Sequence, residues 1–412
     1  MKVRIITRRF RTCPWILVLD TTLAARVNRI KPSPTLAVTA KAAALRAAGE
    51  DVLSLAAGEP DFDTPEHIKE AAIRGLREGH TKYTPVGGTP ALKKAIIAKH
   101  AEDNALEYKP SQIIASVGGK QACYNVCQAL LDAGDEVLIP APYWVSYPDM
   151  ALLADGTPRI VETTAEQRFK MTPESLEAAI TPATRLLFLN SPSNPSGMAY
   201  SKEELAALGE VLRKHPRVVI ASDDMYEKIL WGDAPFANII NACPDLYERT
   251  VVIHAVSKTY SMTGWRLGWS AGPEWLITAM ANIQSQSTSN PTSIAQDAAI
   301  AALTGDQSCV EEMKAAFKTR HDKLVAGLAA LPGVECHPGD GTFYAFPDFS
   351  GAMKAAGFDD DVAYANHILD EAKVALVPGS AFGAPGCMRL SFATAQDVLD
   401  AAVERLAALL QR

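Results

Sequence analysis

The chain has 412 residues, 48% of them hydrophobic, which is enough to bury a large core and long enough for two domains. A net charge of −7 gives no basic surface for nucleic acid, and no apolar run approaches the roughly 20 residues that a membrane-spanning helix needs. The 7 cysteines are scattered without a CxxC pair, and the 8 histidines show no metal-binding spacing. We therefore expect reduced thiols in a cytoplasmic protein, with no metal site, no nucleic-acid partner and no membrane contact.

Residues 1–23 differ in composition from the rest of the chain. Five cations precede the first acidic residue: Lys2, Arg4, Arg8, Arg9 and Arg11. Transit peptides are rich in arginine and poor in acids, so an organellar targeting segment is one interpretation. An upstream start codon or a disordered extension explains the same composition equally well.

The next elements have clear start signals. The Ala-rich run 35–49 predicts a helix, and 52–55 predicts a short strand. Thr64 predicts the N-cap of a second helix whose first residue is Pro65, and Thr89 before a proline predicts another helix start of the same kind.

From residue 113 the chain alternates between strands and helices. Strands are predicted at 113–117, 137–139, 159–162, 185–189, 218–221 and 251–256. One of the helices between them, at 201–213, begins with a capping box formed by Ser201 and Glu204. This alternation is typical of an α/β fold, with a mainly parallel sheet and helices on both of its faces.

After about residue 305 the pattern changes. A long helix at 309–331 is followed by strands near 343–346, 375–377 and 388–392, and by a terminal helix. This succession predicts a smaller α+β unit, which the N-terminal segment can join.

The stretch 251–272 is the one around which the chemistry is organised. Its first strand leads into Ser257 and Lys258 in a short Gly-containing turn, Arg266 follows, and 267–271 predicts a second strand. A lysine at a dry sheet edge can form a Schiff base, because desolvation and neighbouring charge lower its pKa. A surface turn with two ordinary cations is the alternative that this stretch alone leaves open.

Four further motifs follow strand ends, where ligands collect in open α/β sheets. They are Gly118-Gly119-Lys120 before a helix, Pro142-Tyr143-Trp144, the amide-rich and hydroxyl-rich turn 190–197, and Ser222-Asp223-Asp224-Met225-Tyr226. A glycine pair at a helix start suits phosphate, an aromatic suits a flat cofactor, and a buried carboxylate suits a protonated ring nitrogen. Each motif taken alone is equally compatible with an ordinary loop or core position.

Together the motifs resemble class I, fold-type I pyridoxal-phosphate aminotransferases, and more narrowly the bacterial aspartate/prephenate aminotransferase branch. Residues 257–268 match the signature Ser-Lys-x-x-(small)-(apolar)-x-Gly-x-Arg-(apolar)-Gly. The likeness runs from about residue 24 to the C-terminus and includes KPSPT at 31–35, AGEPDFDTP at 57–65, KY at 82–83, GGKQA at 118–122, PYWVSYP at 142–148 and MRLSFAT at 388–394. The chain departs from the family's usual residues at Ser193, Ser196, Asp224 and Ala255.

The resemblance implies roles around the cofactor. Lys258 would hold pyridoxal phosphate covalently and move the proton between the substrate's Cα and the cofactor. Asp223 would pair with the ring nitrogen, while Tyr226 and Asn194 would hydrogen-bond the ring's phenolic oxygen. The other cofactor contacts would come from Trp144, stacked on the ring, and from the phosphate-binding set Gly119, Lys120, Ser257, Arg266 and, from a second subunit, Tyr83.

The resemblance also implies a substrate site. Arg389 would bind the α-carboxylate as a bidentate fork, assisted by Gly58 and Asn194 and bordered by Trp144. Lys120 is the candidate for the distal carboxylate of a dicarboxylic substrate, and Lys31 is the second candidate. The implied reaction is reversible transfer of the amino group between aspartate or glutamate and 2-oxo acids such as 2-oxoglutarate, with prephenate as a further candidate acceptor.

Two other functions are open to a chain of this kind. Alanine or aromatic transamination and β-elimination use the same fold, since fold alone does not settle chemistry. A sensor that binds pyridoxal phosphate without turnover needs an added DNA-binding domain, and the about 23 residues before the resemblance are too few for a helix-turn-helix module. The complete set of Lys258, Asp223, Tyr226 and Arg389 favours catalysis.

The resemblance finally implies a domain plan and a homodimer. An extension at 1–23 would precede a segment, 24–65, that joins the small domain. The large cofactor-binding domain would span 66–304, and the small C-terminal domain 305–412.

Overall fold

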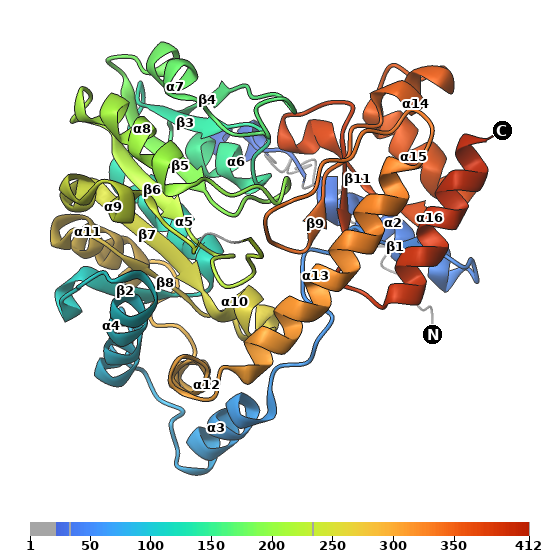
Figure 1. Ribbon diagram of the computed structural model, residues 1–412. Helices are drawn as coiled ribbons and strands as arrows, with labels where there is room; N and C mark the ends of the chain where they lie inside the picture. Colours follow the sequence, from blue (N-terminus) through green and yellow to red (C-terminus); the bar gives the residue numbers. More distant parts are fainter. Residues whose placement is uncertain (1–21, 33, 233–234, 412) are drawn as a thin grey trace, which may run out of the picture.

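The computed structural model describes residues 22–32, 34–232 and 235–411, and the predicted N-terminal extension lies outside them except for its last two residues. A seven-stranded sheet forms the larger of two lobes (Figure 1). Its order is β2 (Ile113–Ser116), β8 (Gly268–Ala271), β7 (Thr250–Ala255), β6 (Val219–Asp223), β5 (Thr184–Asn190), β3 (Glu136–Pro140) and β4 (Thr157–Val161). Only β8 runs antiparallel to its neighbours, so the mainly parallel sheet predicted from the alternation is confirmed.

Helices cover both faces of this sheet because successive strand residues point to opposite sides. Leu186 and Phe188 of β5 pack toward α5 (Gly119–Leu130), α6 (Ser146–Leu153) and α11 (Glu274–Ser285). Leu187 and Leu189 pack on the other side. That side is covered by α3 (Glu66–Arg77), α4 (Pro90–Asn104), α7 (Pro173–Ala179), α8 (Lys202–Arg213), α9 (Ile239–Ala242) and α12 (Ser293–Thr304).

Two of the three predicted helix starts are confirmed. The Thr89 hydroxyl accepts from the Leu92 backbone N–H, and Ser201 and Glu204 form a reciprocal capping box. The prediction for Thr64 is wrong: the N-cap of α3 is Pro65, which has no side-chain hydrogen bond. The Thr64 hydroxyl instead accepts from the Trp265 indole N–H at 3.0 Å and donates to the Ser261 carbonyl at 2.7 Å, so the segment after β7 occupies the oxygen that a cap would use as an acceptor.

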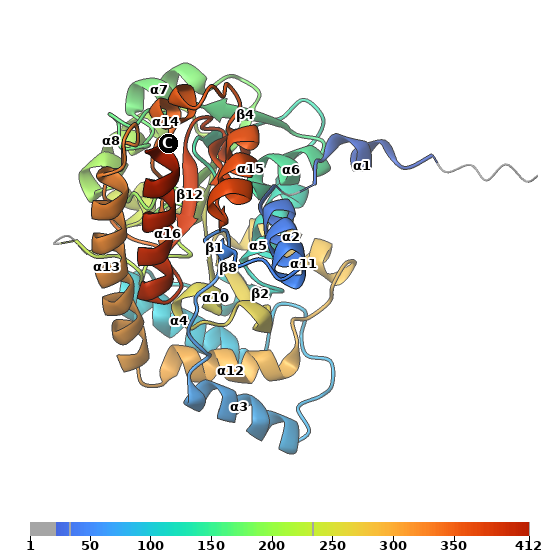
Figure 2. The same ribbon diagram turned by 90° about the vertical axis from the view of Figure 1, so that its right-hand side faces the viewer.

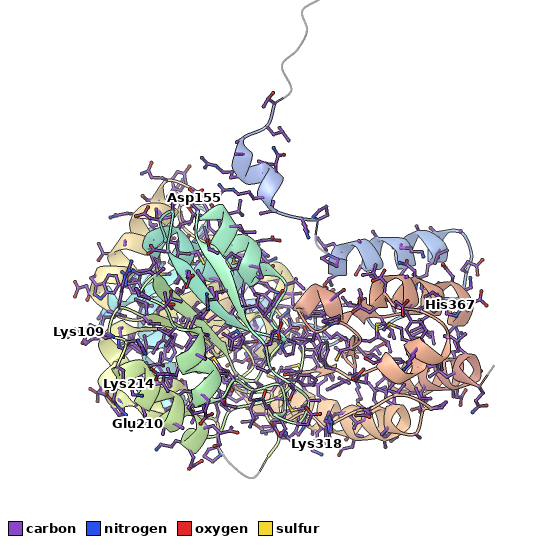
Figure 3. The ribbon with its side chains drawn as sticks, turned by 90° about the horizontal axis from the view of Figure 1, so that it is seen from above. Lys109, Asp155, Glu210, Lys214, Lys318 and His367 are labelled. Carbon is purple, nitrogen blue, oxygen red and sulfur yellow. The ribbon has the colours of Figure 1, made fainter. Side chains whose placement is uncertain are left out.

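The smaller lobe joins both ends of the chain. The N-terminal strand β1 (Leu53–Ser54) pairs in parallel with β10 (Val374–Ala375), and β11 (Val377–Pro378), β12 (Met388–Ser391) and β9 (Tyr344–Ala345) form an antiparallel sheet beside them. Its helices are α2 (Pro34–Ala47), α14 (Ser350–Ala355), α15 (Asp361–Ala372) and α16 (Gln396–Leu410). Seen from above, the two lobes lie side by side (Figure 3).

One long helix, α13 (Ser308–Ala329), connects the lobes. Val310 near its start belongs to the core of the large lobe, whereas Leu324 and Leu328 near its end belong to the core of the small lobe. We propose that these lobes are the two predicted domains, with boundaries after residues 65 and 304.

A short helix, α1 (Ala25–Arg29), projects from the body of the molecule (Figure 2). It contains no buried residue, and Val27 remains 46% exposed. Arg29 anchors its end through an ion pair of 2.6 Å with Asp155. None of the helices in the described part of the chain is long and apolar enough to cross a membrane.

Candidate active site

A cavity of about 290 Å³ lies at the carboxyl ends of β5, β6 and β7, with the small lobe forming its opposite wall. Its lining contains eleven of the residues predicted from sequence: Gly58, Gly119, Lys120, Trp144, Asn194, Asp223, Tyr226, Ser257, Lys258, Arg266 and Arg389. Parallel strands deliver their ends to one edge of a sheet, which explains how residues far apart in sequence meet there.

Lys258 lies in α10 (Val256–Thr259), a single helical turn that directly follows β7, rather than in the expected glycine-containing turn. Its ammonium donates to the Gly58 carbonyl at 2.6 Å. Burial lowers the pKa of Lys258 to about 8, and the positive charges of Arg389, Arg266 and Lys120 act in the same direction while Glu59 opposes them. A lysine with this pKa holds a substantial neutral fraction near pH 7–8, as a nucleophilic amine requires.

Asp223, the last residue of β6, is 5% exposed and forms no ion pair with any cation in the described ranges. It accepts hydrogen bonds from the Tyr147 hydroxyl at 2.5 Å and from the Met225 backbone N–H at 3.4 Å. Burial raises the pKa of Asp223 to about 6, and these two donors oppose the rise. A buried carboxylate in this state can bind a cationic N–H group.

The start of α5 provides a corner that suits a phosphate. The Gly118 backbone has a φ of +83°, and a Cβ there would approach the Arg266 guanidinium to 2.6 Å. A Cβ on Gly268 of β8 would approach the Gly119 backbone nitrogen to 2.5 Å, so only glycine lets this strand pass behind the helix start. Backbone N–H groups, Ser257, Lys120 and Arg266 therefore surround one corner of the cavity.

Arg389, on β12, is held rigidly in the small-lobe wall at 3% exposure. Its guanidinium donates to Asn194 Oδ1 at 3.0 Å and to the Ala56 carbonyl at 2.8 Å. The guanidinium carbon lies 4.6 Å from the Tyr344 ring centroid and 5.0 Å from that of Phe382. Its Nε is buried without a hydrogen-bond partner among the described residues, so the side chain retains donor capacity for a carboxylate.

Lys120 and Trp144 lie on the side of the cavity formed by the large lobe. The Lys120 ammonium lies 5.0 Å from the Trp144 ring centroid and donates to the Ser146 hydroxyl at 3.1 Å. Partial burial, and secondarily the Arg266 charge, lower the pKa of Lys120. Since this cation is not paired with an acidic residue in the described ranges, it can meet an acidic group of a ligand.

Tyr226 and Asn194 lie between these groups. The Tyr226 hydroxyl lies 3.2 Å from that of Tyr344, and burial raises the pKa of Tyr226 well above its ordinary value. The Asn194 backbone N–H donates to Asn190 Oδ1 at 2.9 Å. Both residues line the cavity, so their side chains can present polar atoms to its interior.

Two residues predicted from sequence lie elsewhere. Tyr83 is 92% exposed and does not line the cavity of its own chain. Lys31 lines a separate, neighbouring cavity and not the one that holds Arg389.

The structure adds two residues that sequence reasoning missed. Tyr147 contacts Asp223 and lies one helical turn after Trp144 in the same motif, so its spacing was a usable signal. Tyr344 packs on Arg389 and touches Tyr226, but it comes from the small lobe and no local pattern predicts that contact.

Comparison with known proteins agrees with this geometry. The sequence profile of the family "Aminotransferase class I and II" matches residues 50–406. The chain is 57% identical to an aspartate/prephenate aminotransferase of Nitrosomonas europaea over 94% of this chain and 99% of that protein. It is 53% identical to an aspartate aminotransferase of Geobacillus stearothermophilus over 93% of this chain and 98% of the relative.

Solved structures of similar proteins have the same fold. An aspartate aminotransferase from Rhizobium meliloti superimposes with a TM-score of 0.92 at 45% identity, covering 95% of this chain and 99% of the other. An aspartate aminotransferase from Thermus thermophilus with maleate superimposes with a TM-score of 0.89 at 43% identity, covering 94% and 99% of the two chains.

Proposed function

Because the chain belongs to the class I and II aminotransferase family, we propose that it transfers the amino group reversibly between aspartate or glutamate and 2-oxo acids, prephenate among them. The protein is an aminotransferase of α/β fold-type I, and its cofactor is pyridoxal 5′-phosphate. The observation that carries the substrate proposal is that Lys258, Arg389 and Lys120 line one cavity, and that Lys120 has no acidic partner among the described residues.

The residues of the cavity fit this cofactor. Asp223 is a buried carboxylate without a cationic partner in the described ranges, and it suits the protonated nitrogen of a pyridine ring. The helix start at Gly119, together with Ser257 and Arg266, suits a phosphate dianion. When bound, pyridoxal phosphate supplies a cationic ring that accepts the electrons released when the substrate's Cα–H bond breaks.

We assign the proton transfer at Cα to Lys258. Its lowered pKa places the amine near the operating pH, where a group can both remove and return a proton. Arg389 would hold the α-carboxylate, because its guanidinium is fixed between Tyr344 and Phe382 and cannot follow a displaced substrate. Trp144 would pack on the ring, and Tyr226 and Asn194 would hold its phenolic oxygen.

We assign the distal carboxylate of aspartate or glutamate to Lys120. It lines the catalytic cavity, whereas Lys31 does not, which favours Lys120 between the two candidates. Gly58 would assist at the other end of the substrate, where a Cβ would approach the Tyr344 hydroxyl to 3.0 Å.

We also propose a homodimer in the cytoplasm. Tyr83 is fully available to a neighbouring molecule, and α1 projects away from its own chain with Leu23 at 60% exposure (Figure 2). A second copy of the chain would cover these residues and receive Tyr83 at its phosphate corner.

The experiment that tests the function is single-turnover kinetics of the purified enzyme with aspartate, glutamate, alanine and phenylalanine, followed by return of the amino group to 2-oxoglutarate or prephenate. We expect the two acidic amino acids to react with the highest kcat/KM. A clear preference for alanine or phenylalanine would instead assign the enzyme to another specificity. Borohydride should fix the cofactor to Lys258, and label on another lysine would overturn that assignment.

A further inference from the structure

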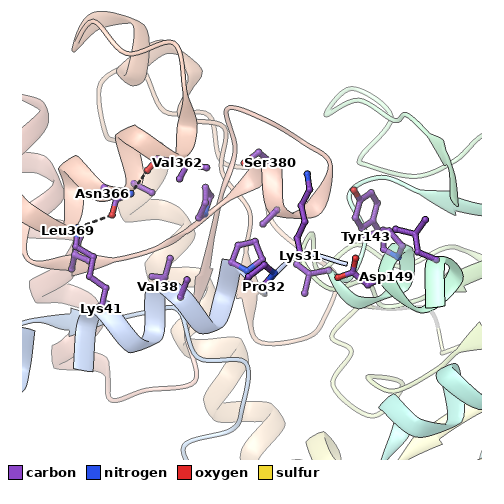
Figure 4. Close-up of a pocket in the computed structure, with 18 of the residues that line it drawn as sticks. Lys31, Pro32, Val38, Lys41, Tyr143, Asp149, Val362, Asn366, Leu369 and Ser380 are labelled. Atoms are coloured by element: carbon purple, nitrogen blue, oxygen red, sulfur yellow. Dashed lines mark hydrogen bonds between the residues drawn. The ribbon is translucent and has the colours of Figure 1, made fainter. Parts of the chain in front are cut away.

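A second cavity, of about 690 Å³, lies beside the catalytic cavity and between the two lobes (Figure 4). Its walls come from α2 and α15 of the small lobe and from α6 of the large lobe. Much of the lining is apolar, with Val38, Val145 and Leu369 on different walls. A cavity of this size, mainly apolar and with a few polar groups, is typical of a small-molecule site.

Two opposite charges face this cavity. Figure 4 shows the Lys31 side chain rising between Ser380 of the small lobe and Tyr143 and Asp149 of the large lobe. The Lys31 ammonium forms no hydrogen bond or ion pair of 4.0 Å or less with a described residue. Burial raises the pKa of Asp149, while the backbone N–H and the positive charge of Lys31 oppose the rise.

The other cations of the cavity already have partners. Lys41 donates to Asn366 Oδ1 at 2.8 Å and forms an ion pair of 3.1 Å with Asp370. Arg29 is paired with Asp155 at 2.6 Å. Among the described cations that line this cavity, Lys31 therefore has free hydrogen-bonding capacity, and its positive charge acts on Asp149.

We propose that this cavity binds the zwitterion of an apolar α-amino acid, with its carboxylate on Lys31 and Ser380, its ammonium on Asp149 and its side chain on the apolar wall. A ligand carrying only negative charge meets repulsion from Asp149, and one carrying only positive charge meets repulsion from Lys31. A purely apolar ligand leaves both charges desolvated without a partner. The Ser380 hydroxyl is exposed to the cavity and supplies a further donor.

The two cavities share a wall, so a ligand in the second cavity can change the shape of the catalytic cavity. Val145 lines both, and α2 contributes Thr35 and Leu36 to the catalytic cavity but Val38 to the second. An occupant that presses on this wall without entering the catalytic cavity changes turnover of aspartate without competing with it. The binding step itself does not depend on the proposed reaction.

The test is calorimetric titration of L-phenylalanine into the cofactor-loaded enzyme with the catalytic cavity saturated by succinate, a dicarboxylate that has no amino group to transfer. We expect one saturable site per chain. Lys31→Met and Asp149→Asn should each weaken binding by ~10-fold or more, the loss of one charge-assisted contact. Lys41→Met is the matched control: it removes a cation that is already paired, so affinity should stay within about twofold.

The same titration in the Arg389→Ala enzyme separates the two cavities. Binding that persists there, and still falls with Lys31→Met, supports the second site. Absence of saturable binding with succinate present, or equal affinity in the wild type, Lys31→Met and Asp149→Asn, overturns it. Ser380→Ala provides a second small change if Asp149→Asn lowers the melting temperature. If phenylalanine does not bind in the second cavity, the reaction with aspartate is still expected. If aspartate is not a substrate, phenylalanine binding in the second cavity is still expected.

Discussion

The Tyr147 hydroxyl lies 2.5 Å from Asp223 Oδ2, and the tyrosine ring stacks on Phe188 with a centroid distance of 4.3 Å. The stacked ring fixes the direction of the hydroxyl, because Tyr147 is 2% exposed and has little freedom to rotate. A donor held in this way stabilises the ionised carboxylate of Asp223, which burial alone would protonate more readily.

Tyr147→Phe should therefore raise the pKa of Asp223 further. Asp223 is then protonated at a higher pH, so the acid limb of the plot of kcat/KM against pH should shift to higher pH. One hydrogen bond to a charged group is worth roughly 1.5–3 kcal/mol, or about 1–2 units of pKa, so the ionised fraction of Asp223, and with it kcat/KM near pH 7, should fall by about 2- to 15-fold. Tyr364→Phe is the matched control: its hydroxyl is buried in the small lobe without a hydrogen-bond partner among the described residues, so the acid limb should stay in place. An unchanged limb in Tyr147→Phe would show that the hydroxyl does not support Asp223.

The lowered pKa of Lys258 predicts a pH dependence in the cofactor-free protein. Its amine is neutral above about pH 8, so the rate at which it captures pyridoxal phosphate covalently should rise with a midpoint near pH 8. Arg389→Leu removes a neighbouring positive charge and should raise the midpoint, whereas Glu59→Gln removes a negative charge and should lower it. Stopped-flow absorbance against pH measures all three. A midpoint at the ordinary value for lysine would mean that the amine is well solvated.

Different mutations should affect the preference for acidic substrates and the binding of amino acids in general. Lys120→Ala should reduce kcat/KM for aspartate and glutamate by about 10- to 150-fold, the worth of one charge-assisted contact, and leave alanine and phenylalanine nearly unchanged. Arg389→Ala should damage every amino acid, since all carry an α-carboxylate. The cofactor content of each variant must be measured, because Lys120 also borders the phosphate corner. Equal losses for acidic and neutral substrates at full cofactor content would remove the distal role from Lys120.

Subunit mixing tests the position of Tyr83. The side chain is 92% exposed on its own chain, so a partner's phosphate corner is the destination we propose for it. Hybrids of Tyr83→Phe and Lys258→Ala chains should contain one site with both defects and one with neither. We expect hybrid dimers to be more active than either mutant homodimer. We also expect the Tyr83→Phe homodimer to retain the cofactor less well than the wild type. Hybrids whose sites always keep a single defect would show that each site is built from one chain.

The sequence alone predicted the large lobe well because its signals are local. The seven strands fall within one or two residues of the predicted ranges, since buried parallel strands are short apolar runs bounded by turns. The caps at Thr89 and Ser201 were also predicted, because each cap needs only residues within one helical turn. The prediction for Thr64 is wrong because its hydroxyl accepts from Trp265 and donates to Ser261, both about two hundred positions away in the chain, and no local pattern reveals these contacts.

The same distinction holds in the site. Asp223 is the last residue of β6 and Lys258 follows the end of β7, so the sheet topology predicts that the two side chains lie close together. The contact of Tyr344 with Arg389 depends on how the small lobe is placed against the large one, and that placement is a tertiary property. Lys31 illustrates the limit: the sequence supplied a cation near the substrate, but not which of two adjacent cavities it faces.

The pairing of β1 with β10 also sets an order of events during synthesis. On the ribosome, the seven strands of the large sheet are complete once residue 271 has emerged, and Lys258 is then already in the chain. Arg389 and its acceptor, the Ala56 carbonyl, are 333 positions apart, so the small lobe forms only when nearly the whole chain has been made. Until then β1 is an unpaired strand of only two residues, too short to template pairing with another nascent chain.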